Sequence, residues 1–182
     1  MAKFRVVETL TFSGGSDNIG AITMNMAVLA TDNNEIASYT NLYDKYKICS
    51  YKVTFVPRLD AFTGYAGNTD ATQNLILWTC LDYDDGEAPA SVREVMNYRN
   101  ARWTRGAATH SRYIKYPHIL GTVQSTAAAV GASVSRAPWR DCKTLNINHF
   151  GFKYACKPGG AAANKTVFDV VITAYVKFAG RR

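Results

Sequence analysis

The sequence predicts an all-β protein, an eight-stranded antiparallel jelly-roll sandwich with one short helix and long loops. Runs of alternating apolar and polar residues, rich in Val, Thr, Tyr and Phe, recur along the chain and are separated by Gly-, Asn- and Asp-rich turns. Strands do not alternate with helices as parallel βαβ units require, and long loops between strands favour a jelly roll over a meander. A chain of 182 residues is expected to form one domain, residues 1–182.

The clearest predicted strand lies in the stretch Tyr43–Pro57, which reads YDKYKICSYKVTFVP. Between residues 51 and 56 an apolar set of side chains alternates with a more polar set, as in a strand with one buried face. Pro57 ends this strand. Before it, residues at spacings of three and four predict a short helical turn that leads into the strand: Tyr39, Leu42, Tyr43 and Tyr46.

The remaining elements follow from the same patterns. Seven further stretches are predicted to be extended: 3–12, 19–30, 74–81, 101–105, 111–118, 147–156 and 166–178. Turns are expected at 13–18, 31–34 and 157–160, and a long surface loop at 58–73. Ser91 is the predicted N-cap of a helix from Val92 to Tyr98, with Glu94 placed to complete a capping box. The small-residue run from Gly121 to Ser135 belongs to the loops in this prediction.

Charge is distributed unevenly along the chain. The net charge is +7, but residues 1–94 hold 7 Lys/Arg and 12 Asp/Glu, whereas residues 95–182 hold 14 Lys/Arg and only two acids. A basic half favours an anionic partner, and nucleic acid before a membrane. Charged residues make up only 19 % of the chain and there are 11 tyrosines, a composition that suggests surface covered by partner subunits. No apolar run is long enough to cross a bilayer, so no membrane insertion is expected.

The residues that usually carry catalysis or bind metal form no recognisable motif. The four cysteines lie too far apart in sequence to form a metal-ligand pair: Cys49, Cys80, Cys142 and Cys156. We therefore expect reduced thiols, no bound metal and no cofactor. His110, His118 and His149 are isolated from any nucleophile motif, so an enzyme is not expected. The acidic cluster at residues 82–87 could serve a carboxylate pair or a divalent cation, but a solvated turn is the simpler interpretation.

A basic stretch interleaved with aromatic residues follows the predicted helix. Its cations, with two more at the start of the chain, are expected to contact nucleic acid without sequence preference: Lys3, Arg5, Arg99, Arg102, Arg105, Arg112 and Lys115. Three of its rings are candidates for base stacking: Tyr98, Trp103 and Tyr113. The same residue types are enriched at subunit interfaces, which remains the alternative for the whole stretch. Tyr43, Tyr46 and Trp139 are candidate interface residues, and Trp139 is expected to be anchored in the protein.

Several short motifs occur in the order seen in one viral family. A tyrosine-rich turn leads into the basic alternating strand of residues 43–57, and an acidic turn at 81–85 and a short helix follow. Next come Tyr98–Arg102, the basic stretch 105–117, the isolated Trp139, and His149–Gly151 before the penultimate strand. Over most of residues 38–178 the chain resembles the capsid proteins of circovirus-type viruses, which have small circular single-stranded DNA genomes.

The resemblance implies a jelly-roll coat protein that assembles with itself into a small, T=1-like icosahedral capsid around single-stranded DNA. It also implies a virion protein that is assembled inside the host cell, in the nucleus, and recognises a host receptor of unknown identity. Members of the family usually begin with a long arginine-rich arm, whereas this sequence has only Lys3 and Arg5 there. The body of the domain is therefore expected to supply the genome-binding charge. Two alternatives remain: the coat of a satellite or small RNA virus, and a jelly-roll lectin in which Trp78, Trp103 or Trp139 stacks on sugar.

Overall fold

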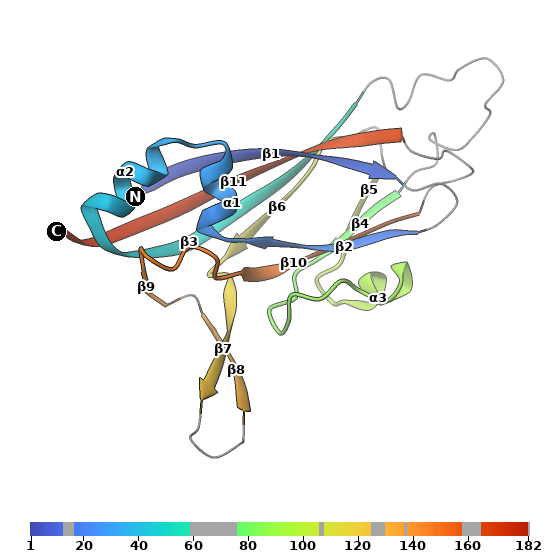
Figure 1. Cartoon of the computed structure of the whole chain (residues 1–182). Helices are drawn as coiled ribbons and strands as arrows, with labels where there is room; N and C mark the ends of the chain where they lie inside the picture. Colours follow the sequence, from blue (N-terminus) through green and yellow to red (C-terminus); the bar gives the residue numbers. More distant parts are fainter. Residues whose placement is uncertain are drawn as a thin grey trace.

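The computed structural model describes residues 1–12, 17–58, 76–105, 108–124, 130–136, 138–157 and 165–181. They form two antiparallel sheets packed face to face, with helices at one end and on one side (Figure 1). The first sheet has three long strands and the shorter β6, and the two-residue β9 (Arg140–Asp141) pairs with β3 near its start. The strand order of this sheet is β1 (Ala2–Phe12), β11 (Lys165–Arg181), β3 (Tyr43–Pro57) and β6 (His110–Lys115).

The second sheet lies below the first in Figure 1. Its strand order is β2 (Asn18–Met24), β10 (His149–Lys157), β4 (Ile76–Cys80) and β5 (Arg102–Arg105). A hairpin of β7 (His118–Gln124) and β8 (Val130–Arg136) joins this sheet through the pair of Phe150 with His118. Each sheet draws strands from both halves of the chain, which is the double Greek-key arrangement of a jelly roll.

Strand alternation fills the space between the sheets with aromatic side chains. Phe55, a fully buried residue near the C-terminal end of β3, has its ring 5.9 Å from that of Phe152 on β10 and 5.8 Å from that of Phe168 on β11. Tyr51 is also fully buried, and its hydroxyl donates a hydrogen bond to the backbone oxygen of Ile22 across the sandwich. Each ring of this size contributes about 1.5–3 kcal/mol of stabilisation by its burial. The sandwich is therefore held together by residues of strands that are far apart in sequence.

The structure has three short helices in the described residues, where the sequence predicts one. The predicted helix is present as α3 (Val92–Asn97), where Ser91 Oγ accepts from Glu94 N at 3.2 Å. The predicted helical turn is present in α2 (Glu35–Leu42) for Tyr39 and Leu42, but it is wrong for Tyr43 and Tyr46, which belong to β3. The third helix, α1 (Met26–Thr31), overturns the prediction that residues 19–30 are extended throughout. No helix in the described ranges is long and apolar enough to cross a membrane.

A cap explains why the extended segment ends at Met24. Asn25 Oδ1 accepts a hydrogen bond of 2.7 Å from Val28 N, which is the geometry of a helix N-cap. Met26 and Leu29, three residues apart, then bury the same face of α1. The alternating apolar residues of this segment favour a strand in sequence, but the Asn cap and the buried i, i+3 pair favour a helix.

The described residues contain three strands beyond the predicted eight: β7, β8 and the short β9. The hairpin of β7 and β8 contains most of the small-residue run from Gly121 to Ser135, which is predicted to be a loop. Its Gly, Ala and Ser residues have low strand propensity, which hides it from pattern-based prediction. The predicted loop at 58–73, apart from Arg58, lies outside the described residues, as do most of the turns at 13–18 and 157–160.

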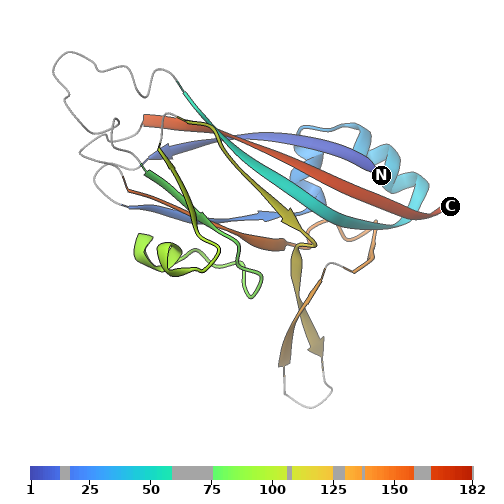
Figure 2. The same ribbon diagram turned by 180° about the vertical axis from the view of Figure 1, so that it is seen from behind.

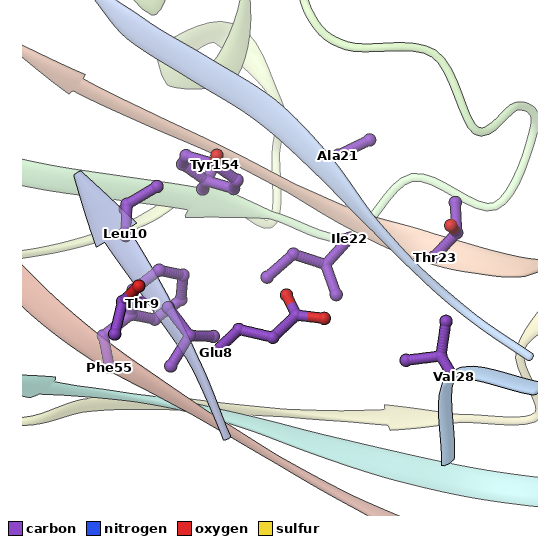
Figure 3. Close-up of a pocket in the computed structure, with 10 residues that line it drawn as sticks. Glu8, Thr9, Leu10, Ala21, Ile22, Thr23, Val28, Phe55 and Tyr154 are labelled. Carbon is purple, nitrogen blue, oxygen red and sulfur yellow. The ribbon is translucent and has the colours of Figure 1, made fainter. Parts of the chain in front are cut away.

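A cavity of about 270 Å³ lies between the sheets where β1 and β2 run along one side of the sandwich (Figure 3). Its walls are both polar and apolar, with Thr9, Thr23 and Tyr154 beside Leu10, Ile22, Val28 and Phe55. The side chain of Glu8 extends from β1 toward Ile22. This acid occupies an inward-facing position of the strand, so it interrupts the apolar alternation that Phe4 and Val6 begin.

Candidate nucleic-acid interface

The register of the first sheet brings outward-facing residues of all four strands into rows. Because side chains alternate along each strand, every second residue of β1, β11, β3 and β6 points away from the core. Two of these rows contain two cations each. The first has a cation at both ends, Lys3–Tyr175–Ser50–Lys115, and the second has cations at its first and third positions, Arg5–Thr173–Lys52–Tyr113. The third row, Val7–Val171–Thr54–Ser111, is uncharged.

Six cations therefore gather on the outer side of the first sheet, which we call the basic face: Lys3, Arg5, Lys47, Lys52, Lys115 and Lys177. Five of them are exposed and Lys47 is half-buried. Neighbouring strands are about 4.8 Å apart and alternate residues of a strand are about 6.8 Å apart, so these charges are closely spaced. The rows named here contain no carboxylate, and Asp169 lies beyond the uncharged row, where it pairs with Arg58.

Lys47 and Lys177 are direct cross-strand neighbours on this face. Like charges in directly opposed positions destabilise a sheet unless something neutralises them. An anion bound beside both ammonium groups would offset this repulsion. The pair is therefore a like-charge contact that an anionic partner on the basic face would stabilise.

Two tyrosines lie among the cations. The rings of Tyr113 and Tyr175 are 6.3 Å apart and meet edge to face. The Tyr113 hydroxyl donates a hydrogen bond of 2.6 Å to Ser50 Oγ, which fixes the ring although 52 % of the residue is exposed. A fixed and accessible aromatic ring beside cations suits stacking on an unpaired base.

The structure divides the basic stretch predicted from the sequence. Lys115 and Tyr113 lie on the basic face, together with Lys3 and Arg5. Three other arginines are exposed beside Trp103 at the edge of the second sheet, on β5 and the segment before it. We call these three arginines and Trp103 the β5 patch: Arg99, Arg102, Arg105 and Trp103. Trp103 is 55 % exposed and its ring is 6.1 Å from that of Trp78 on the neighbouring strand.

Arg112 does not belong to either surface, and its prediction as a nucleic-acid contact is wrong. It faces inward from β6 and is only 6 % exposed. Its guanidinium donates hydrogen bonds to the backbone oxygens of Thr79 at 3.4 Å and Asn100 at 3.1 Å. Burial, with the nearby charge of Arg102, lowers the pKa of Arg112. A side chain held in this way connects the two sheets and cannot reach a phosphate outside.

Tyr98 is also held within the chain. It is half-buried beside α3, and its hydroxyl donates a hydrogen bond of 2.5 Å to Asp82 Oδ2. This hydrogen bond, together with burial, raises the pKa of Tyr98 above its ordinary value. Trp103 and Tyr113 therefore offer more accessible rings for base stacking than Tyr98 does.

The acidic turn is not simply solvated, because Asp82 is 5 % exposed. Lys153 Nζ lies 2.7 Å from Asp82 Oδ2 and 2.8 Å from Asp85 Oδ1. Burial by itself would raise the pKa of Asp82, but hydrogen bonds from Lys153 and Tyr98 hold that pKa below its ordinary value. The solvated-turn interpretation is wrong for Asp82, which forms a buried ion pair, while Asp84 and Glu87 are exposed as expected.

The three predicted interface residues differ in accessibility. Tyr46 is fully buried and its hydroxyl donates to the backbone oxygen of Thr144 at 2.9 Å, so its prediction as an interface residue is wrong. Tyr43 is half-buried against Phe178, with ring centroids 5.7 Å apart. Trp139 is expected to be anchored in the protein, but at 43 % exposure it is not buried in the core of its own chain. Its place at a subunit interface remains a proposal.

Sequence reasoning missed half of the basic face: Lys47, Lys52 and Lys177, and with them Tyr175. They lie on β3 and β11, which are more than a hundred residues apart in sequence yet adjacent in the sheet. The available signal was the alternation of β3 and β11, which separates these residues from the buried set. The register between the strands could not be read from the sequence.

Comparison with known proteins identifies the family. The sequence model described as circovirus capsid protein matches residues 2–182. In structure, the chain is similar to the BFDV capsid protein from a 60-mer (TM-score 0.67, 13 % identity, 99 % of this chain and 94 % of that chain). It is also similar to the decameric BFDV capsid protein (TM-score 0.56, 14 % identity, 97 % of this chain and 98 % of that chain). A third similar structure is that of Cucumber Necrosis Virus (TM-score 0.54, 14 % identity, 99 % of this chain and 57 % of that chain). The search of curated proteins gave no match. These neighbours confirm the jelly-roll capsid fold, and the chain belongs to the circovirus capsid protein family as a viral coat protein, a structural component of the virion.

Proposed function

We propose that this coat protein assembles with copies of itself into a T=1 icosahedral shell that encloses a single-stranded DNA genome. The structurally similar BFDV capsid protein occurs as a 60-mer, and sixty copies are the number that the smallest icosahedral shell contains. The family match favours a DNA genome over the RNA-virus alternative. We place assembly inside the host cell, in the nucleus, on the same family grounds.

The observation that carries the proposal is the basic face. Its six cations lie on one side of the first sheet, in rows that contain no carboxylate. Ammonium and guanidinium groups bind phosphate through charge and counterion release, without reading bases. We infer that the basic face lines the inside of the shell and contacts the genome non-specifically, with Tyr113 stacking on unpaired bases. The exposed arginines of the β5 patch form a second proposed contact surface.

The experiment compares two variants with the same change in charge. Arg5→Ala/Lys52→Ala removes two cations from one row of the basic face. Arg93→Ala/Lys143→Ala removes one arginine and one lysine that are exposed elsewhere, on α3 and after β9. Binding of single-stranded DNA of several sequences is measured by fluorescence anisotropy at a series of salt concentrations.

For the basic-face variant, the slope of log affinity against log salt should flatten by about 1.4, since each phosphate contact on a single strand contributes about 0.7. The loss should be equal for all sequences, and the control should keep the wild-type slope. If both variants flatten the slope equally, only net charge matters and the basic face is not a contact surface. The variant Arg99→Ala/Arg102→Ala/Arg105→Ala tests the β5 patch in the same assay.

A further inference from the structure

The hairpin of β7 and β8 stands apart from the body of the protein. Its strands are joined by seven cross-strand pairs, from His118 with Arg136 to Gln124 with Val130. Among the residues that the structure describes, its strands pair with the sandwich only at the base of the hairpin, where His118 meets Phe150. Figures 1 and 2 show the hairpin projecting on the side of the second sheet, away from the first sheet.

The base of the hairpin is firmly fixed. Tyr116, between β6 and β7, has a φ of 56°, the only positive value for a non-glycine residue in the described ranges, and its N–H donates to Cys49 O at 3.0 Å. The ammonium of Lys115 and the guanidinium of Arg136 lie 5.1 Å and 5.9 Å from the centre of its ring. A non-glycine residue occupies this left-handed conformation at a cost, which surrounding structure must support.

Two further contacts hold the first residues of β7. His118 Nδ1 lies 2.9 Å from the backbone oxygen of Tyr83, and the rings of these two residues are 4.8 Å apart. Ile119, the next residue, is fully buried. The body of the protein therefore sets the direction of the hairpin, and a preorganised arm loses little freedom when it docks.

Beyond this base, the sequence of the hairpin is unusual for a ribbon that projects from the body of the protein. Residues 119–135 contain no Asp, Glu, Lys, Arg or Pro. An isolated two-stranded ribbon is marginally stable in water, and exposed strand edges normally carry charges or proline to prevent pairing with other chains. The absence of cations also argues against a nucleic-acid arm.

The same molecule does protect another strand edge. On β1, the N–H of Val7 donates to Asp32 Oδ2 at 3.2 Å, and Asn33 Nδ2 donates to the backbone oxygen of Arg5 at 2.8 Å. Side chains of the α1–α2 connection thus occupy backbone groups that would otherwise be open to a new strand. The hairpin sequence offers no charged side chain for such a purpose.

We propose that the β7–β8 hairpin docks onto a second copy of this chain, and that it is a principal contact between neighbouring coat subunits. The inference rests on the proposed assembly into a shell. A second copy is the fitting partner because each copy exposes large apolar side chains that also need covering, among them Trp139 (43 % exposed) and Leu42 (41 %). An uncharged ribbon is complementary to such surfaces.

The test introduces charge into the hairpin without preventing its formation. Thr122 and Ala132 are cross-strand partners, so Thr122→Lys/Ala132→Glu adds an opposed pair that is compatible with the ribbon. The control, Thr122→Ser/Ala132→Ser, changes the same positions without charge. A third variant replaces residues 121–133 by an Asn-Gly turn. Particle yield is measured by sedimentation velocity and electron microscopy, and folding by circular dichroism and thermal melting.

We expect the charged and shortened variants to stay folded and to lose at least tenfold in particle yield, while the serine control assembles normally. If wild-type protein forms no particles, the proposed shell itself is wrong. If wild-type protein and the charged variant assemble equally well, only the hairpin inference is overturned. It is also overturned if the charged variant assembles normally but packages less DNA.

Hydrogen exchange on wild-type protein decides the case in which the variants fail to fold. Amides of β7 and β8 are compared in particles and in dissociated subunits. Docking onto a second copy should slow their exchange at least tenfold in particles. Equal exchange in the two states would show a hairpin that projects freely from the shell, and would overturn the inference.

Discussion

Lys153 Nζ lies 2.7 Å from Asp82 Oδ2, with only 4 % and 5 % of the two side chains exposed. The pair connects β10 to the acidic turn after β4. Tyr98, at the C-terminal end of α3, donates to the same carboxylate, so three elements meet at one buried charge. Removing one partner of such a pair leaves the other charge buried without compensation, which is far more costly than removing both.

We expect Lys153→Met to lower the free energy of unfolding by about 3–5 kcal/mol. The double variant Lys153→Met/Asp82→Leu should lose less than the single variant, because it leaves no uncompensated charge. Lys143→Met, at an exposed lysine after β9, serves as the control and should be nearly neutral. Urea unfolding of unassembled subunits measures all three. A cost for Lys153→Met no larger than that of the control would contradict a structural role for the pair.

The pH dependence of stability should come largely from two buried histidines. Burial lowers the pKa of both His110 and His149 from 6.5 to about 4; nearby Arg112 and Arg102 add to the effect at His110. Between these values the unfolded chain binds more protons than the folded chain, so the free energy of unfolding must fall as pH falls from 6.5 to 4. The loss is on the order of 3 kcal/mol per histidine.

His110→Gln should therefore lower the slope of the unfolding free energy against pH between pH 6.5 and 4. The decrease should correspond to at most one fewer proton taken up on unfolding, as measured by urea unfolding at pH 7, 6 and 5. Below pH 4 a further loss is expected from Asp82, whose pKa is lowered in the folded state, so that its contribution disappears as the pH falls through that folded value. His118→Gln offers a comparison at a less buried histidine. Identical slopes for wild type and His110→Gln would mean that His110 already binds its proton when folded.

Trp139 should matter for assembly and little for the stability of the subunit. Because it is 43 % exposed, Trp139→Ala should lower the free energy of unfolding by about 1 kcal/mol or less, against the 3–5 kcal/mol typical of a buried ring. The particle yield should fall several-fold if the exposed indole packs against a neighbouring subunit. Met96→Ala, at a residue of similar exposure (46 %) on α3, is the control. Unchanged particle yield would remove Trp139 from the interface.

Substitutions of Tyr113 distinguish the contribution of base stacking to DNA affinity from that of charge. Tyr113→Ala should weaken binding to single-stranded DNA by about 1–3 kcal/mol and leave the salt slope unchanged, because it removes a ring and no cation. Tyr113→Phe keeps the ring but loses the hydrogen bond to Ser50 Oγ, so it should retain most of the affinity. Anisotropy titrations at two salt concentrations measure both. Equal affinity of Tyr113→Ala and wild type would exclude base stacking at this position.

The sequence indicates the parts of the fold that depend on local patterns. The alternation of Tyr51–Val56 and the Ser91 cap predict β3 and α3 correctly because each signal lies within a few residues. The same alternation in β6 places Arg112 on the buried side with His110 and Ile114, and applying it there would have separated Arg112 from Tyr113 and Lys115. Grouping residues 98–116 by composition alone obscured this division.

Other features depend on relationships that no local pattern contains. The basic face forms only when the register of β1, β11, β3 and β6 is known, because its cations come from residues 3 to 177. The β7–β8 hairpin consists of small residues with weak strand propensity, so cross-strand pairing determines its structure. The buried state of Asp82 depends on Lys153, a residue of the neighbouring strand β10 that lies 71 positions later in the sequence.

The alternation of buried and outward residues in the first sheet has a consequence for how such a coat protein can diversify. On β3, Lys52 faces outward while its neighbours Tyr51 and Val53 are fully buried. Substitutions at outward positions can therefore adjust the number of charges toward the cargo without altering the packing between the sheets. A lineage could in this way follow changes in genome length or particle loading through single amino-acid replacements, while the architecture of the subunit remains under separate selection.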